Sequence, residues 1–147
     1  MNKPKYLPVG TVSHGTLNPR DVIPCFEDAL RSLSGGTKEL LALAPVPPTH
    51  PDAVEYVDAL ISTLDLFCPA FCYFGAHEGD ASDFGCWPFM DSIDHAIELK
   101  EALALPDLTQ LPRAYTGDVF LTDSQGNYTD HYRVIKGRSY KQWSIDD

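Results

Sequence analysis

The sequence predicts an α+β protein whose antiparallel sheet of about five strands is covered on one face by two to four helices. Three observations support this fold class: amphipathic helical segments fill the first half, an aromatic-rich hairpin lies in the centre, and a three-stranded meander ends the chain. Runs of helices and of strands, without regular βαβ alternation, are typical of α+β proteins. The 147 residues fit a single domain, residues 1–147.

Two helices are expected before residue 45. Asp21 is a plausible N-cap for a helix from Val22 to Leu33, which would place Pro24 in the first turn, where its missing N–H costs nothing. Gly35 and the glycine after it would end this helix. Residues 38–44 predict a short second helix, ended by a proline-rich connector.

The most regular helical pattern runs from Pro51 to about Phe67. Its apolar residues form one stripe, and its acids lie largely off that stripe, at Asp52, Glu55, Asp58 and Asp65. This helix is therefore expected to present an acidic outer surface. A further helix is predicted from Ser92 to about Leu105, with Asp91 as its N-cap.

The central hairpin is predicted from strands at residues 70–76 and 83–89, joined by a loop of about seven residues. The loop gathers four polar groups, His77, Glu78, Asp80 and Asp83. Carboxylates and an imidazole could hold a divalent cation that activates water, but their spacing matches no established ligand motif. A partner-contacting loop and an ordinary polar turn are the two alternatives.

The last forty residues predict a meander from strands within 117–123, 128–135 and 139–145. Aromatic and basic residues share it, notably Tyr132, Arg133 and Trp143. Such a combination can bind nucleotides by stacking and charge, although it also occurs on sheets with one polar face.

No catalytic residue is assigned from the sequence. Ser13 and His14 are adjacent, but adjacent side chains usually point apart, and there is no G-x-S-x-G motif. Four cysteines without CxxC spacing are expected to be buried free thiols. No cofactor is expected.

Charge restricts the class of partner. The chain carries a net charge of −10, and residues 21–107 hold 16 acids against 3 bases, a net of −13. Such a surface repels phosphate backbones, so direct nucleic-acid binding is disfavoured, whereas a basic protein surface is a compatible partner. No apolar run approaches the ~18 residues of a membrane-spanning helix, and the N-terminus lacks the apolar segment of a secretory signal. A cytoplasmic location is therefore expected.

Three stretches together, SHGT, CYFGAHEGDASDFGCW and GNYTDHYRVIKGRSYKQWSI, resemble short uncharacterised acidic proteins of temperate phages and bacterial mobile elements. The resemblance covers most of the chain and carries no assigned catalytic residue. It implies a bacterial host and a role as an inhibitor of host defence, acting by stoichiometric binding to a CRISPR effector, a restriction enzyme or a signalling nucleotide.

The sequence thus favours a non-enzymatic binding protein that presents the acids of residues 52–65 and the loop 77–83 to a basic host protein. A second version has the meander sequestering a nucleotide signal. A small metal-dependent hydrolase using His77, Glu78, Asp80 and Asp83 is the alternative from another class. A third possibility is a structural accessory protein that forms homo-oligomers through its sheet edge.

Overall fold

The computed structural model describes residues 2–146 and confirms the α+β class. The chain divides into two compact units, Met1–Trp87 and Pro88–Asp147, where a single domain was expected. Each unit contains its own sheet, with three strands in the first and four in the second. The expected five-strand antiparallel sheet is therefore wrong, because the central hairpin and the C-terminal meander belong to different sheets.

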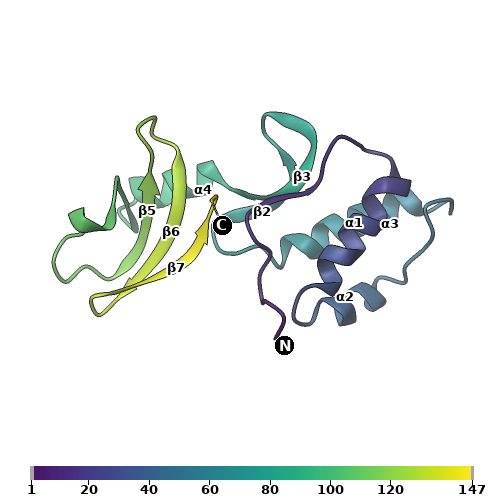
Figure 1. Ribbon diagram of the computed structural model, residues 1–147, viewed down its shortest axis with the longest axis horizontal. Coiled ribbons are helices and arrows are strands. Elements are labelled where there is room, and N and C mark those ends of the chain that lie inside the picture. The colour runs from purple at the N-terminus through teal and green to yellow at the C-terminus, as the bar shows by residue number, and fades with distance from the viewer. Residues whose placement is uncertain (1, 147) are drawn as a thin grey trace. The chain divides into compact units, whose positions relative to one another are not determined.

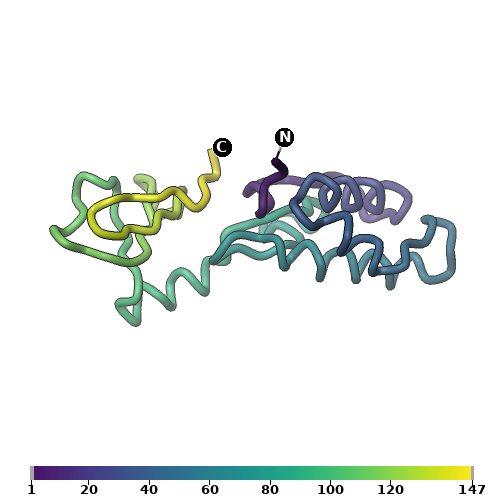
Figure 2. The backbone as a smooth tube through the Cα atoms, turned by 90° about the horizontal axis from the view of Figure 1, so that it is seen from below, coloured from purple at the N-terminus to yellow at the C-terminus, as the bar shows by residue number. Residues whose placement is uncertain are grey.

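The first unit combines three helices with a small sheet (Figure 1). The strand order is β1-β3-β2, and β1 pairs antiparallel with β3. The helices lie together beside this sheet, as the tube in Figure 2 shows. In chain order the elements are β1 (Gly10–Ser13), α1 (Pro19–Arg31), α2 (Gly36–Ala42), α3 (Ala53–Asp65), β2 (Cys72–His77) and β3 (Asp80–Pro88).

The core of the first unit forms where α1 packs on α3 and on the sheet. Phe26 of α1 is fully buried and meets the rings of Phe74 and Phe84 edge-on, with centroids 5.4 and 5.6 Å apart. Leu60 and Leu64 of α3 are also fully buried. The helical spacing of these residues is the pattern that the sequence showed, so burial of one stripe explains why the helices form here.

The first helix begins earlier than expected. Its N-cap is Asn18, whose side chain accepts a hydrogen bond from the Arg20 N–H, and Asp21 falls in the first turn. Pro24 therefore lies inside the helix, where it removes a backbone hydrogen bond. The second helix begins at Gly36, directly after Gly35 in a left-handed conformation.

The second unit contains one helix and a four-stranded sheet of order β4-β5-β6-β7. Its elements are α4 (Met90–Glu98), β4 (Ala102–Leu105), the 3₁₀ turn η1 (Leu108–Gln110), β5 (Gly117–Thr122), β6 (Tyr128–Ile135) and β7 (Arg138–Ser144). The predicted helix to Leu105 is wrong: α4 stops at Glu98, and residues 102–105 form a strand parallel to β5. Phe89, rather than Asp91, occupies the N-cap position of α4.

The C-terminal meander is confirmed, with β5 antiparallel to β6 and β6 antiparallel to β7. The register of β6 against β7 shifts between His131 and Tyr132, which leaves Gln142 of β7 as the extra residue. Both His131 and Val134 are fully buried although they are three residues apart. A bulge of this kind interrupts the alternation of a strand. Simple alternation from the sequence could not place His131 in the core.

The central hairpin is tighter than expected. Only Glu78 and Gly79 separate β2 from β3, so Asp80 and Asp83 lie on a strand rather than in a seven-residue loop. None of the helices within residues 2–146 has the length and apolar composition needed to cross a membrane.

Candidate functional site

The pairing of β1 with β3 places His14 next to Asp80, although their positions in the chain differ by 66. The His14 Nε2 atom lies 3.0 Å from Asp80 Oδ2, with 63% and 45% of the two side chains exposed. The Gly15 N–H also donates to the Ser82 carbonyl at 3.1 Å. The segment after β1 is thus attached to the first residues of β3.

Two further bonds hold the carboxylates of this strand. Asp80 Oδ1 accepts from the backbone N–H of Ser82 at 3.0 Å and from its hydroxyl at 2.8 Å. The two bonds from Ser82 lower the pKa of Asp80, and the bond from His14 lowers it further, because each one stabilises the ionised carboxylate. Asp83 instead accepts from the Thr11 hydroxyl at 2.8 Å.

His77 has partners other than Asp80 and Asp83. Its ring meets the ring of Trp87 edge-on, with centroids 4.7 Å apart, and its Nδ1 accepts from the Gly79 N–H at 2.9 Å. Glu78 is exposed at the turn. His77, Asp80 and Asp83 therefore have separate partners, and Glu78 is exposed.

This geometry bears on the metal-dependent alternative. Within residues 2–146, no three side chains of His, Cys, Asp or Glu are arranged to hold a metal ion. The turn residues thus lack the shared ligand set that water activation by a metal needs.

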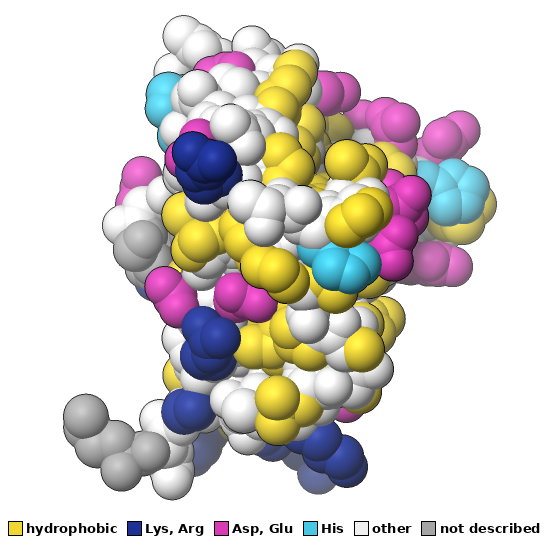
Figure 3. Space-filling view, turned by 90° about the vertical axis from the view of Figure 1, so that its right-hand side faces the viewer, with side chains coloured by type: hydrophobic (Ala, Val, Ile, Leu, Met, Phe, Trp, Pro, Cys, Tyr) yellow, Lys and Arg dark blue, Asp and Glu magenta, His cyan; other side chains and the backbone are white. Residues whose placement is uncertain are grey.

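The acids of α3 divide into two groups. Asp52, Glu55 and Asp58 are exposed along the N-terminal half of the helix, and Val54, 62% exposed, lies among them. Asp65 instead accepts from the Phe74 N–H at 2.8 Å and joins the end of α3 to β2. Figure 3 views this end of the first unit, where acidic side chains lie among hydrophobic ones.

The exposed acids of α3 and the hairpin turn form separate surfaces. The start of α3 lies at the far end of the first unit from the hairpin in both Figure 1 and Figure 2. A partner that contacts both, as the sequence suggested, would have to reach from one end of the first unit to the other. We call residues Asp52, Glu55 and Asp58 the acidic helix face.

The meander does not present its aromatic residues as expected. Trp143 is only 4% exposed and lies beside Phe120 and His131, whose rings stack with centroids 4.5 Å apart. Trp143 is thus a core residue rather than a surface platform. Arg133 remains half exposed and contacts the Asp118 carboxylate at 3.3 Å, while Tyr132 is partly buried.

His131 and Asp118 form a pair that the sequence did not indicate. The His131 Nε2 atom lies 2.9 Å from Asp118 Oδ1, and the imidazole is fully buried. Burial lowers the pKa of His131, and the nearby Arg133 adds to this effect, although Asp118 opposes it. His131 lies opposite Phe120 of β5 and Trp143 of β7, both buried, and these partners on other strands cannot be read from the alternation of β6.

The cysteines are free, as predicted, but only Cys86 is fully buried. Cys25, Cys68 and Cys72 are partly buried.

No protein-family model, curated protein or solved structure matches this chain. Its function must be argued from the surfaces described above.

Proposed function

We propose that the protein is a non-enzymatic, stoichiometric binding protein that recognises a basic protein surface through its acidic helix face. The observation that carries this proposal is the exposure of Asp52, Glu55 and Asp58 without a Lys or Arg partner among the described residues. The His50 Nδ1 atom lies 3.9 Å from Asp52 Oδ2 and accepts a hydrogen bond from the Asp52 N–H at 3.0 Å. These carboxylates remain available to an incoming partner.

The arrangement of the acidic helix face suits docking. Its three acids recur at intervals of three residues, which places them on one side of α3. Val54 adds an exposed apolar contact beside them. Opposite charges on the two proteins speed their association and select the partner. Burial of a small apolar contact then stabilises the complex.

A protein partner fits these charges better than a nucleic acid does. The first unit carries 11 acids and 5 bases, a net of −6, so phosphate groups would be repelled. The Lys and Arg residues of a protein that itself binds nucleic acid would be attracted. The resemblance to phage and mobile-element proteins supports a host defence component, such as a CRISPR effector or a restriction enzyme, as that partner.

Capture of partners from a bacterial host lysate, read by mass spectrometry, tests this proposal. We expect the triple variant Asp52→Asn/Glu55→Gln/Asp58→Asn to bind the captured partner roughly tenfold more weakly. Each exposed ion pair contributes about 0.2–1 kcal/mol, and about 1.4 kcal/mol is a factor of ten. Binding of the wild type should also weaken as salt rises, because the charges are exposed.

A matched control separates a local contact from overall charge. The variant Asp91→Asn/Glu98→Gln/Glu101→Gln removes the same charge from exposed positions of the second unit. It should retain wild-type affinity. Equal affinity of the α3 variant and the wild type would refute the role of the acidic helix face.

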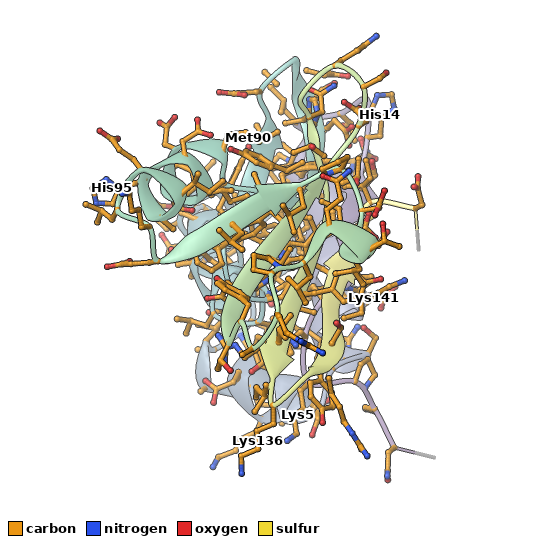
Figure 4. The ribbon with its side chains drawn as sticks, turned by 90° about the vertical axis from the view of Figure 1, so that its left-hand side faces the viewer. Lys5, His14, Met90, His95, Lys136 and Lys141 are labelled. Atoms are coloured by element: carbon orange, nitrogen blue, oxygen red, sulfur yellow. The ribbon has the colours of Figure 1, made fainter. Side chains whose placement is uncertain are left out.

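Nucleotide sequestration is a second candidate, favoured by the basic end of the second unit. Lys136 lies at the turn between β6 and β7, and Lys141 lies on β7 (Figure 4). Arg138 and Tyr140 are exposed on the same hairpin, and Tyr140 is the aromatic residue that could stack on a base. Calorimetry against cyclic dinucleotides and ADP-ribose derivatives tests this candidate. Absence of heat for every member would reject it.

A further inference from the structure

The chain between α2 and α3 is rich in proline. It reads PVPPTHP from Pro45 to Pro51, and we call residues 45–51 the proline connector. Each proline ring fixes its φ at about −65°. Val46 and Pro47 also precede prolines, which restricts both to extended backbone. The first half of the connector is therefore stiff before any partner binds.

Hydrogen bonds fix the end of the proline connector to the start of α3. The His50 N–H donates to the Pro47 carbonyl at 2.9 Å, which closes a turn. His50 then accepts twice, its Nδ1 from the Asp52 N–H and its carbonyl from the Ala53 N–H, both at 3.0 Å. The connector thus has a defined position directly beside the acidic helix face, which begins at Asp52.

The connector turns two proline rings outward. Pro45 and Pro47 are exposed, whereas Val46 and Pro48 are partly buried. Of these four residues only Val46 has an N–H, because proline has none. Among residues 2–146, no hydrogen bond reaches the carbonyls of Pro45, Val46 or Pro48. The segment therefore offers a partner apolar rings and hydrogen-bond acceptors, with almost no donors.

A groove lined with aromatic side chains suits this set of groups. Rings of Trp and Tyr pack against proline rings, and their N–H and O–H groups can donate to backbone carbonyls. A segment that is already extended loses little conformational freedom on binding. Addition to the edge of a partner's sheet does not suit it, because prolines cannot donate to a strand ladder.

We propose that the partner of the acidic helix face also has an aromatic groove that holds Pro45 and Pro47, with Lys or Arg residues beside the groove. This inference rests on the proposed function. Charge complementarity carries the second part, since Asp52, Glu55 and Asp58 follow the connector directly and have no Lys or Arg partner among the described residues. The prolines supply apolar contact, and the acids supply charge.

NMR titration of the nitrogen-15-labelled protein with two blocked peptides tests the proposal. One peptide alternates lysine with tryptophan, and the other has glycine in place of each tryptophan, so the two have the same charge. We expect the tryptophan peptide to bind roughly tenfold more tightly. It should shift the amide signals of Val46 and Thr49 as well as those of Glu55 and Asp58. Equal affinity for the two peptides, or unshifted Val46 and Thr49 signals, would overturn the proposal.

Two double variants assign the contact. Pro45→Ala/Pro47→Ala should bind the two peptides equally, because the outward rings are gone. Pro106→Ala/Pro112→Ala, at exposed positions of the second unit, should keep the preference for tryptophan. A preference that persists in the first variant would contradict the proposal, and circular dichroism checks that both variants are folded.

The same titration separates this proposal from the proposed function. If neither peptide shifts the Glu55 and Asp58 signals, the acidic helix face does not recognise basic groups, and the proposed function fails. If both peptides shift those signals while Val46 and Thr49 stay in place, only the aromatic groove is refuted.

Discussion

Gly85 lies where two strands of the first unit come closest. A Cβ atom at this position would lie 2.1 Å from the Gly10 carbonyl oxygen of β1, closer than any real side chain allows. The pairing of Thr11 with Gly85 therefore depends on the absence of a side chain. The same approach places the neighbouring Cys86 against Gly10.

Gly85→Ala should lower the free energy of unfolding by about 1–3 kcal/mol, the usual cost of overpacking a close-packed site. Gly75→Ala is the matched control, because its Cβ would meet only the Tyr73 ring, at 3.5 Å. Urea denaturation of both variants measures the difference. Equal stability of the two alanine variants would contradict the close approach of β1 and β3.

His131 is predicted to make stability depend on pH. Burial keeps the folded-state pKa below the unfolded value of 6.5, so the unfolded chain binds more protons in acid. The contribution of a neutral His131 is fully present above pH 6.5 and is lost as pH falls toward the folded pKa. The free energy of unfolding should therefore decrease between pH 7 and pH 5.

Two variants separate the contribution of His131 to the pH dependence from that of other histidines. His131→Gln should flatten the pH dependence of stability over that range, whereas His95→Gln, at an exposed position of α4, should leave its slope unchanged. Denaturant titrations at several pH values measure the slopes. An unchanged slope in His131→Gln would show that another group titrates.

At the scale of elements, Asp65 connects a helix to a strand. Its carboxylate accepts the Phe74 N–H, and this bond fixes the start of β2 relative to the end of α3. We expect Asp65→Ala to lower the free energy of unfolding by about 1.5–3 kcal/mol, because the bond involves a charged group. Asp58→Ala, on the exposed side of the same helix, should change it by less than about 0.5 kcal/mol. Thermal denaturation of the two variants shows whether the loss of Asp65 destabilises the fold more than the loss of Asp58.

Elements with strong local patterns could be predicted from the sequence. The meander has glycine turns at Gly126 and Gly137, both with positive φ, between alternating strands. The α3 helix has a continuous apolar stripe. Strand β4 was missed because its residues, ALAL, continue the apolar pattern of the preceding helix, and because parallel pairing with β5 is a long-range contact.

The candidate sites were harder to predict because they, too, depend on contacts between residues far apart in the chain. The pair His14–Asp80 comes together only when β1 joins β3 in one sheet. Exposure of the α3 acids could be predicted from helical periodicity. The separate role of Asp65 could not, because its hydrogen-bond partner lies on another element.

At the scale of the whole molecule, each unit has its own buried residues. In the second unit, Ile93 of α4 and the sheet residues Val119, Phe120 and Val134 are fully buried. We therefore predict that residues 88–147 fold when produced alone, although a fragment of this size is marginally stable. Dispersed amide signals in a two-dimensional NMR spectrum would confirm this prediction. A random-coil spectrum would instead favour one cooperative domain for the entire chain.

Strand β7 forms one edge of the second sheet, and its outer residues affect how copies of this protein meet. The edge includes Arg138 and Lys141, both exposed. If the β7 strands of two molecules paired edge to edge, their cationic side chains would be brought together in the new ladder. The opposite edge, β4, has only four residues. We therefore expect the sheet to resist growth by edge pairing, so that concentrated solutions show a constant particle mass by light scattering.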